Sequence, residues 1–322
     1  MTRIRRWRND ALVAVVLLAV ALLAPESRSQ EFPSGPLTWI VPVTAGGAFD
    51  SLARGVSPAL SQELGVPVVV KNIPGAEGYN QFYRSKPDGQ TIGMVDVVGE
   101  LAQALVRKQV YDVSKFAYLG RINSGTNLFV AWPKSPFKKI EDLKKAKEPI
   151  RCASFGGIST PTLECILISA RMGFPLTIVR FPGPAEAIVG VVRGDADIAT
   201  LGATLWLDHI AKGNVIPLLL WADQADARVP GVPSLKDLGL EQLKVATVQR
   251  SVATSPGTPP ARVQALSRAL EKTIKSDQVQ KFLLQRKLET DTQIGDAFRQ
   301  TLSDIVDLLK KHEAVIKNFV KS

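Results

Sequence analysis

A glycine-containing turn between a predicted strand and a predicted helix constrains the fold of this chain more than any other feature. Leu37–Val43 is rich in β-forming residues and runs into Ala45-Gly46-Gly47. From Asp50 onward, apolar residues recur at helical spacing until Gly65, and the strand-like run Val66–Val70 follows. A strand, a tight turn, a helix and a strand in this order form a βαβ unit, whose two strands lie parallel in one sheet. The sequence therefore predicts an α/β fold.

Short apolar runs and helical stretches continue to alternate after this unit. Further strands are predicted at Thr91–Val95, Leu128–Trp132, Ile150–Ala153, Thr177–Arg180, Ile198–Leu201 and Val215–Trp221. Helices are predicted at Lys139–Lys147, Thr160–Met172, Ala185–Arg193 and Thr204–Lys212. The chain of 322 residues is longer than the roughly 100 to 200 residues of a typical domain. Two α/β lobes are therefore expected.

The C-terminal part differs, because it is predicted to be helical. Thr258 is expected to cap a helix that begins at Pro259, and Ser276 and Thr292 are expected to cap two more. We predict that this tail returns to the first lobe. The expected division is residues 1–29 as a signal peptide, residues 30–126 plus 250–322 as lobe one, and residues 127–249 as lobe two.

The first thirty residues have the parts of a secretory signal peptide. Four arginines precede the apolar run Ala11–Ala24, and small residues surround Ser29. The run is shorter than the about 20 residues that span a bilayer, so an uncleaved anchor is the less favoured alternative. Cleavage is expected after Ser29, with Ala24 as the second choice. The mature protein is therefore predicted to be soluble and exported.

The charge of the chain points first to anionic partners. It has 40 Lys plus Arg against 30 Asp plus Glu, a net +10, of which five arginines and two acidic residues lie in residues 1–29 and leave +7. The lysine pairs at 138–139, 144–145 and 310–311 are interleaved with acidic residues rather than with aromatic residues that could stack on bases. Binding of nucleic acid is therefore not expected.

Two cysteines and two histidines exclude a disulfide-dense scaffold and leave little for a histidine-built metal site. Cys152 lies at the end of a predicted strand and Cys165 lies inside a predicted helix, so they could pair in an oxidising compartment. Burial is the commonest fate of free cysteine, and two buried thiols are the favoured interpretation. No metal and no cofactor are expected.

Two strand-to-helix turns are the candidate anion sites. The first comprises Thr44, Ala45, Gly46, Gly47, Phe49 and Asp50, and the second comprises Phe155, Gly156, Gly157, Ile158, Ser159 and Thr160. Each helix would point its unpaired N–H groups and the positive end of its dipole into the turn, where a carboxylate or phosphate could bind. The alternative is that the glycines only make the turns and that Asp50 only caps its helix.

Signatures of common enzyme classes are absent from the sequence. There is no H-E-x-x-H, G-x-S-x-G, G-x-x-x-x-G-K-[ST] or G-x-G-x-x-G motif. No catalytic residue is therefore proposed, and the chain is not expected to be an enzyme.

A series of ordered motifs resembles a known family. The motifs are Pro42–Asp50, Lys71–Ala76, Lys86–Thr91, Tyr111-Asp112, Gly194–Asp197, Val229–Ser234 and Pro256–Pro259. Together they are similar to the Bug family, the periplasmic solute-binding proteins of tripartite tricarboxylate transporters. The resemblance runs from about Phe32 to the C-terminus.

The resemblance implies a type II periplasmic binding protein, in which two α/β lobes joined by a hinge close on a small carboxylated solute. One carboxylate would be held by main-chain groups between the two glycine turns, and residues near Thr200 and Leu201 would read the rest of the solute. The implied partners are a small carboxylate, which could be a dicarboxylate, a tricarboxylate or an aromatic acid, and the permease subunits of the transporter. A monomer is expected.

Several positions depart from the family pattern. Ser159 stands at a glycine, Leu163 at a histidine, and Leu201 at an aspartate. These changes predict a more apolar distal pocket. Asp96 and Glu100 replace small polar residues, and they could face either a ligand ammonium group or solvent.

Delivery of a carboxylate to a membrane permease is the leading functional hypothesis. A role as the ligand-binding accessory of a membrane sensor is the alternative, since the same fold would serve it. An exported enzyme is a remote third hypothesis.

Overall fold

The computed structural model describes residues 32–288 and 290–321. The predicted signal peptide and both candidate cleavage sites lie outside the described residues. The described residues from 35 onward form one compact unit, and residues 32–34 belong to a separate N-terminal segment. Within the described part of the chain, no helix is both long and apolar enough to cross a bilayer.

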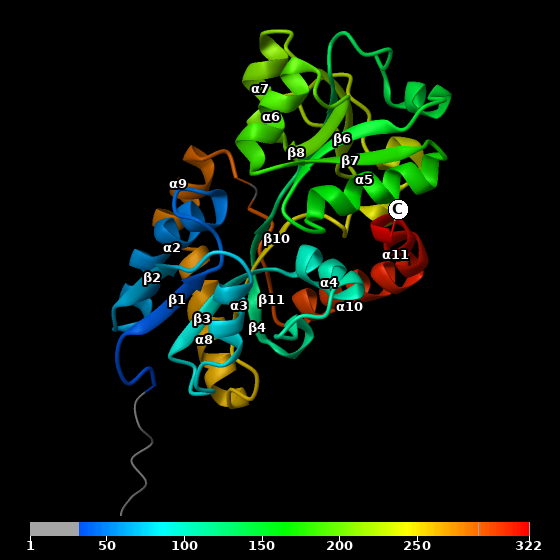
Figure 1. Cartoon of the computed structure of the whole chain (residues 1–322). Helices are drawn as coiled ribbons and strands as arrows, with labels where there is room; N and C mark the ends of the chain where they lie inside the picture. Colours follow the sequence, from blue (N-terminus) through cyan, green and yellow to red (C-terminus); the bar gives the residue numbers. More distant parts are fainter. Residues whose placement is uncertain (1–31, 289, 322) are drawn as a thin grey trace, which may run out of the picture. The chain divides into compact units, whose positions relative to one another are not determined.

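Six strands form the first sheet, in the order β11-β4-β10-β3-β1-β2. They are β1 (Leu37–Val41), β2 (Val68–Asn72), β3 (Thr91–Asp96), β4 (Ala117–Ser124), β10 (Gln249–Thr254) and β11 (Gln293–Ile294). β1 pairs in parallel with both β2 and β3, as the βαβ pattern predicts. β10 lies antiparallel between β3 and β4, so a late segment of the chain completes the sheet (Figure 1).

Five strands form the second sheet, in the order β7-β6-β8-β5-β9. They are β5 (Asn127–Ala131), β6 (Ile150–Phe155), β7 (Leu176–Phe181), β8 (Ile198–Gly202) and β9 (Ile216–Trp221). β6 is parallel to β7 and β8, whereas β5 is antiparallel to β8 and β9. All eight strands predicted from the sequence are present, within a few residues of their expected bounds.

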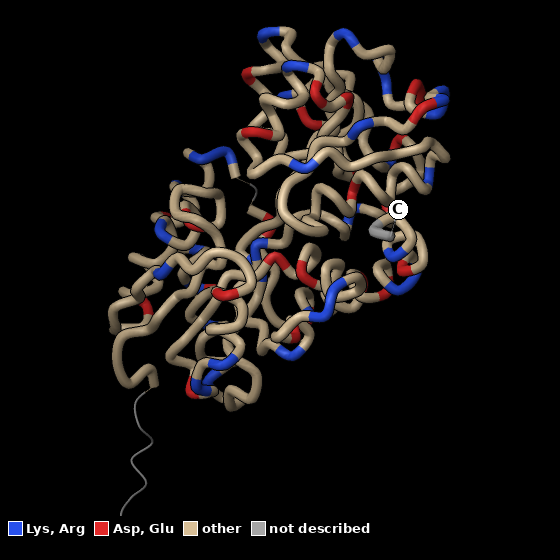
Figure 2. The backbone as a smooth tube through the Cα atoms, viewed as in Figure 1, with Lys and Arg blue, Asp and Glu red and all other residues tan. Residues whose placement is uncertain are grey.

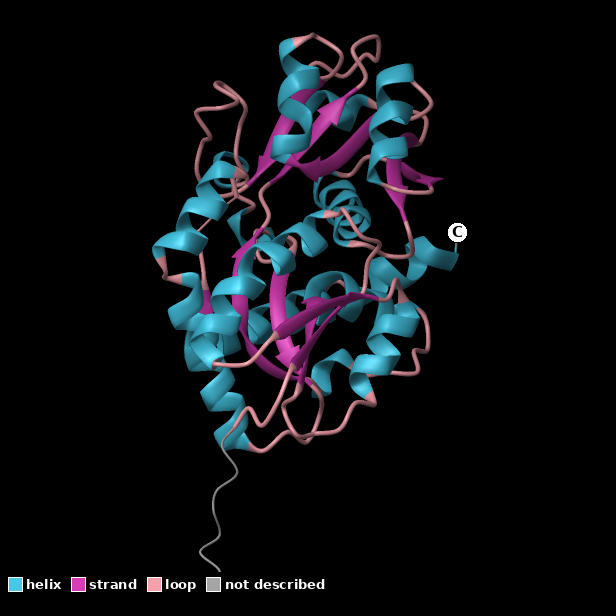
Figure 3. Cartoon of the chain, turned by 90° about the vertical axis from the view of Figure 1, so that its left-hand side faces the viewer, coloured by secondary structure: helices cyan, strands magenta, loops and turns pink. Residues whose placement is uncertain are grey.

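Helices pack on both sheets (Figure 3). The helices associated with the first sheet are α2 (Ala48–Leu64), α3 (Ala76–Tyr83), α4 (Val97–Val106), α8 (Pro260–Ile274), α9 (Asp277–Gln285), α10 (Asp296–Lys311) and α11 (Glu313–Lys321). α2 packs against α8 and α9, and α4 packs against α10 and α11. The tail helices thus join the first sheet, as expected.

Three helices cover the second sheet: α5 (Thr160–Met172), α6 (Pro184–Arg193) and α7 (Ala203–Ala211). Neighbouring strand residues point to opposite faces. Cys152 and Ile198 pack in one apolar cluster with residues of α5, whereas Ala153 and Ala199 pack in a second cluster with residues of α6 and α7. α5 also packs against α4 and α11, so it is the helix of the second sheet that contacts the first sheet's helices.

Four predicted details of the helices were wrong. The helix expected at Lys139–Lys147 is a short 3₁₀ helix, Ile140–Lys145. Thr258 does not cap α8, because its hydroxyl donates to the carbonyl of Ser255 at 2.9 Å and Pro259 is the N-cap. Thr292 does not cap α10, because its hydroxyl donates to Ile122 O at 2.8 Å. The described tail has four helices rather than three. Ser276 caps α9 as predicted.

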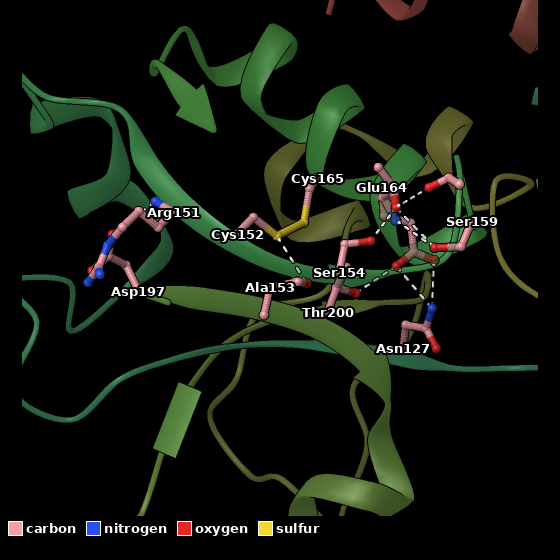
Figure 4. The surroundings of a disulfide bond; sticks show 12 residues. Asn127, Arg151, Cys152, Ala153, Ser154, Ser159, Glu164, Cys165, Asp197 and Thr200 are labelled. Atoms are coloured by element: carbon pink, nitrogen blue, oxygen red, sulfur yellow. Dashed lines mark hydrogen bonds and ion pairs between the residues drawn. A yellow bond between two sulfur atoms is a disulfide. The ribbon is translucent and has the colours of Figure 1, made fainter. Parts of the chain in front are cut away.

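The expectation of two buried thiols was wrong, because Cys152 and Cys165 form a disulfide (Figure 4). Both residues are fully buried. Cys152 lies in β6 and Cys165 in α5, and the packing of α5 on this face of the sheet brings their Cα atoms to 6.9 Å. The disulfide therefore closes the strand, turn and helix that contain the second candidate anion site.

Candidate functional site

The first turn, Thr44–Asp50, connects β1 to α2. Gly46 has a φ of 88°, which is a left-handed conformation that favours glycine, and Gly47 is the N-cap of α2. The N-cap makes no side-chain hydrogen bond to the helix. The first N–H groups of α2 lack partners within the helix, as at any helix N-terminus, and they are the donors that an anion would use.

Asp50 braces this turn from within. Its carboxylate accepts a hydrogen bond from the Gly46 N–H at 2.8 Å and pairs with Arg54 at 2.9 Å. Arg54 in turn donates to Asn72, whose amide donates to Val43 O. Burial raises the pKa of Asp50, but the hydrogen bond from Gly46, the contact with Asn72 and the charge of Arg54 outweigh it, so the pKa lies below its usual value. Asp50 is therefore part of the turn's own structure.

The second turn, Phe155–Thr160, connects β6 to α5. Gly156 has a φ of 68°, and Ser159 is the N-cap, with a side chain that accepts from Thr162 N. The hydroxyls of Ser154, Ser159 and Thr162 form a hydrogen-bonded network at the start of α5. Ile158 is buried in the apolar core. The predicted residues of this turn thus divide between donors at the helix start and supports in the core.

Thr160 bonds to the first sheet rather than to its own turn. Its hydroxyl donates to the Asp96 carboxylate, at 2.9 Å and 3.2 Å from the two oxygens, and Asp96 is the N-cap residue of α4. Burial raises the pKa of Asp96 to about 6, and the hydrogen bonds from Thr160, Gly99 N and Gln249 N with the charge of Arg250 partly offset it. Asp96 therefore places a carboxylate of the protein beside the start of α5.

Glu100 lies one turn further along α4. It accepts a hydrogen bond from the Tyr111 hydroxyl at 2.7 Å. Burial raises its pKa to about 7, and the charge of Asp96 adds to this shift. Of the two departures noted in the sequence, Asp96 thus contacts the second sheet's helix and Glu100 contacts Tyr111.

Thr200 contacts a buried glutamate. Its hydroxyl donates to Glu164 at 2.6 Å, and Asn127 donates to both oxygens of the same carboxylate at 2.9 and 3.0 Å (Figure 4). Burial raises the pKa of Glu164 to about 8. Leu201 points to the other face of β8 and packs in the apolar cluster that contains Trp206. The structure therefore does not bring Leu201 to the second turn. Thr200 contacts Glu164, which lies four residues after Thr160, the last residue of that turn.

Two arginines that the sequence analysis missed lie beside the turns. Arg180, at the end of β7, donates through Nη1 to Gly156 O at 2.7 Å and Gly157 O at 3.0 Å. Arg250 in β10 has its guanidinium 5.9 Å from the centre of the Phe49 ring, and it is paired in register with Asp96. Arg180 ends a predicted strand, which is the signal that could have found it, whereas Arg250 lies in β10, which the sequence did not predict.

The described residues contain no metal-binding cluster, and a cavity that they line lies apart from both turns. Within the described residues, no group of three or more His, Cys, Asp or Glu could hold a metal ion. A cavity of about 420 Å³ is lined by Phe137, Asp142, Lys147 and neighbouring residues, and neither turn contributes to it. Basic and acidic residues are interspersed along the chain (Figure 2).

A protein-family model matches most of the chain. The model described as "Tripartite tricarboxylate transporter family receptor" matches residues 52–320. The chain belongs to this family. Its relative BugT from Bordetella pertussis is 26% identical over 284 residues, covering 84% of this chain and 85% of BugT. The resemblance to the Bug family is thereby confirmed.

Solved structures of similar proteins agree with this assignment. The periplasmic binding protein BugD has a TM-score of 0.70 and 22% identity, covering 88% of this chain and 99% of BugD. MatC from Rhodopseudomonas palustris with bound malate has a TM-score of 0.68 and 22% identity, covering 90% and 100%. An R. palustris protein with adipate has a TM-score of 0.70 and 20% identity, covering 88% and 98%. The expected periplasmic-binding-protein fold is confirmed, and family and fold are those of solute-binding proteins.

Proposed function

We propose that this receptor binds a small carboxylate in the periplasm and delivers it to the permease of a tripartite tricarboxylate transporter. The observation that carries the proposal is the pair of strand, glycine turn and helix units, one in each sheet. Each turn has a glycine at positive φ and a helix that begins directly after it. Backbone N–H groups at a helix start bind carboxylates without a charged side chain.

The solutes of related structures support a carboxylate. MatC holds malate and the second R. palustris protein holds adipate. We propose that the solute binds to residues Thr44 to Asp50 and Phe155 to Thr160. That residues near Thr200 and Leu201 read the rest of the solute stays a prediction; in the structure their side chains contact Glu164 and the apolar core.

The proposed lobes are residues 30–126 plus 250–322 and residues 127–249. This division is supported by the strands, because β1 to β4 and β10 share one sheet and β5 to β9 share the other. Closing of two lobes over a solute would hide it from water and change the surface offered to the permease. A cleaved signal peptide and a monomeric mature protein complete the proposal.

A thermal-shift panel of mono-, di- and tricarboxylates tests the function. A ligand present at 100 times its Kd should stabilise the protein by about 2.7 kcal/mol. Phosphate and neutral amides of the same solutes serve as comparisons. Failure of every carboxylate to raise the Tm would contradict the proposal.

Substitution of Gly47 tests the site itself. A Cβ at this position would meet Thr44 O at 3.6 Å and Val43 Cγ2 at 4.0 Å, which is ordinary contact, so a side chain fits. Gly47→Asp and Gly47→Asn should both fold, because both residues are good N-caps. Only the aspartate places a negative charge at the helix start. Loss of carboxylate binding in Gly47→Asp with retention in Gly47→Asn is expected, and equal binding by both would overturn the site.

A further inference from the structure

We propose that Arg180 binds the second carboxylate of a dicarboxylate solute side-on, through its Nε and Nη2 atoms, and thereby selects dicarboxylates over monocarboxylates. This inference rests on the proposed function and names a residue for it. The turns supply backbone N–H groups for one carboxylate, whereas Arg180 supplies a full positive charge for the other.

The position of Arg180 follows from the sheet. β6 and β7 are parallel, and Arg180 is in register with Ser154, directly before the second turn. The carboxyl ends of neighbouring parallel strands meet at one edge of a sheet. Solutes of open α/β folds bind outside this edge. Arg180 therefore lies where the second turn presents its helix start.

The hydrogen bonds of Arg180 use one nitrogen only. Nη1 donates to the carbonyls of Gly156 and Gly157 and holds them on the strand side of the turn. Among the described residues, no hydrogen bond to its Nε or Nη2 is found, and no carboxylate lies within ion-pair distance. The side chain is exposed. The free edge of the guanidinium is the edge that binds carboxylates with two parallel hydrogen bonds.

Arg151 shows the same binding mode within this chain. It lies near the start of β6, and its Nε and Nη2 atoms donate to the two oxygens of Asp197 at 3.1 and 2.7 Å. Its remaining nitrogen donates to Asp195 O. An acidic residue of the protein thus satisfies Arg151. Arg180 likewise donates to backbone carbonyls but has no carboxylate partner in the part of the chain that the structure describes. Its Nε and Nη2 atoms can therefore bind a carboxylate of the solute.

The helix that faces this turn adds a polar side chain, and the two carboxylates at its start have hydrogen-bond partners other than Arg180. Gln103 of α4 lies so close that a Cβ on Gly157 would be 2.0 Å from its Oε1. The carboxylate of Asp96, on the same side, bonds to Thr160, and that of Glu100 bonds to Tyr111. The charge of Arg180 is therefore uncompensated beside the second turn, so an anionic group is favoured there.

The test is a comparison of ligands and variants by calorimetry. Straight-chain dicarboxylates of four to eight carbons are paired with monocarboxylates of the same length, such as adipate with hexanoate. Arg180→Met should weaken the tightest-binding dicarboxylate by roughly 10- to 100-fold, the range for hydrogen bonds to charged groups, and its monocarboxylate partner by less than about threefold. Arg193→Met, an exposed arginine at the end of α6, is the matched control and should change neither.

Two further measurements keep structural and binding roles apart. Arg180→Lys retains the charge and a donor for the carbonyls but cannot bind a carboxylate side-on, so it should still reduce the preference for dicarboxylates. Equal losses for both members of a ligand pair would show that Arg180 only holds the turn and would overturn the inference, as would unchanged dicarboxylate affinity in Arg180→Met. Absence of binding of any carboxylate to the wild-type protein would instead overturn the proposed function, and this inference with it.

Discussion

The two glycine turns have the same sequence logic but different supports. The first turn is held by residues of its own βαβ unit, since Asp50, Arg54 and Asn72 form a continuous chain of contacts from Gly46 to Val43. The second turn is held within its own unit by Arg180 of β7 and by the hydroxyls of Ser154, Ser159 and Thr162, and it is also held by Asp96 at the end of β3. Both turns use the next strand of their own unit, but only the second also depends on a residue of the other sheet.

This difference indicates which turn can respond to a solute. A preformed turn costs little reorganisation when a carboxylate binds. In the proposed site, a carboxylate that reaches Thr160 would share its hydroxyl with Asp96. We infer that the first turn binds the solute with little rearrangement and that the second turn changes its hydrogen bonds when the solute binds. Four predictions test this contrast.

The largest effect is expected from the disulfide, which joins the strand and helix on either side of the second turn. Closing a loop of this size stabilises a protein by about 3 kcal/mol in the chain-entropy model. Reduction should lower the free energy of unfolding of the wild-type protein and leave a Cys152→Ala, Cys165→Ala variant unchanged. Hydrogen exchange should rise at residues 155–160 and not at 44–50. An equal rise in both turns would remove the contrast.

Removal of the Asp50 carboxylate should come next. Asp50→Ala leaves the Gly46 N–H and Arg54 without their acceptor, and we expect a loss of about 2 kcal/mol of unfolding free energy. Asp296→Ala is the matched control, because Asp296 also pairs with an arginine one turn away but its side chain is 94% exposed, against 5% for Asp50. Denaturant unfolding measures both. A loss in the control as large as that in Asp50→Ala would show that burial is not the cause.

Glu164 should make stability depend on pH. Its pKa is raised by burial from 4.5 to about 8, so the folded protein binds a proton more tightly than the unfolded chain. Stability from this group is present below pH 4.5 and is lost as the pH rises through 8. Glu164→Gln imitates the protonated acid and should lose less unfolding free energy than wild type between pH 5 and pH 9. The exposed Glu241→Gln is the control. A difference between wild type and Glu164→Gln that does not vary with pH would contradict this assignment.

The smallest effect is expected at Asp96. Below its pKa of about 6 the side chain is neutral, and above it a negative charge stands beside Thr160. Affinity for a dicarboxylate should therefore fall by about fivefold as the pH rises from 5.5 to 7.5, which corresponds to about 1 kcal/mol of repulsion near a surface. Asp96→Asn should show a smaller fall, because Glu100, with a pKa of about 7, still gains charge over this range. Calorimetry at the two pH values checks this, and a fall of the same size in Asp96→Asn would assign it to another group.

The sequence predicted which strands and turns form better than it predicted which of them are neighbours in the fold. The eight expected strands and both glycine turns follow from local periodicity and glycine positions. β10 was missed because Gln249-Arg250-Ser251 is polar, and its pairing with β3 and β4 joins segments far apart in the chain. The cap of α8 was misplaced by one residue because Thr258 bonds backward to Ser255.

For the site, too, the sequence predicted the local structure but not the contacts with distant parts of the chain. Glycines and helix starts identify the turns, but the contacts of Thr160 and Gly156 are made by Asp96 and Arg180, which come from other elements. The role of Asp50 follows from its spacing to Gly46 and Arg54 within one unit. Contacts within a unit can thus be inferred from spacing, whereas contacts across sheets require the order of the strands.

The central place of β10 has a consequence for the order of folding. β10 separates β3 from β4, so the first sheet stays open along its middle until residues 249–254 have been synthesised. The tail helices α8 and α10 follow only later. Non-local pairing of this kind is slow to form. Most of the chain can therefore leave the ribosome before its first sheet can close, which is compatible with the export proposed for this protein.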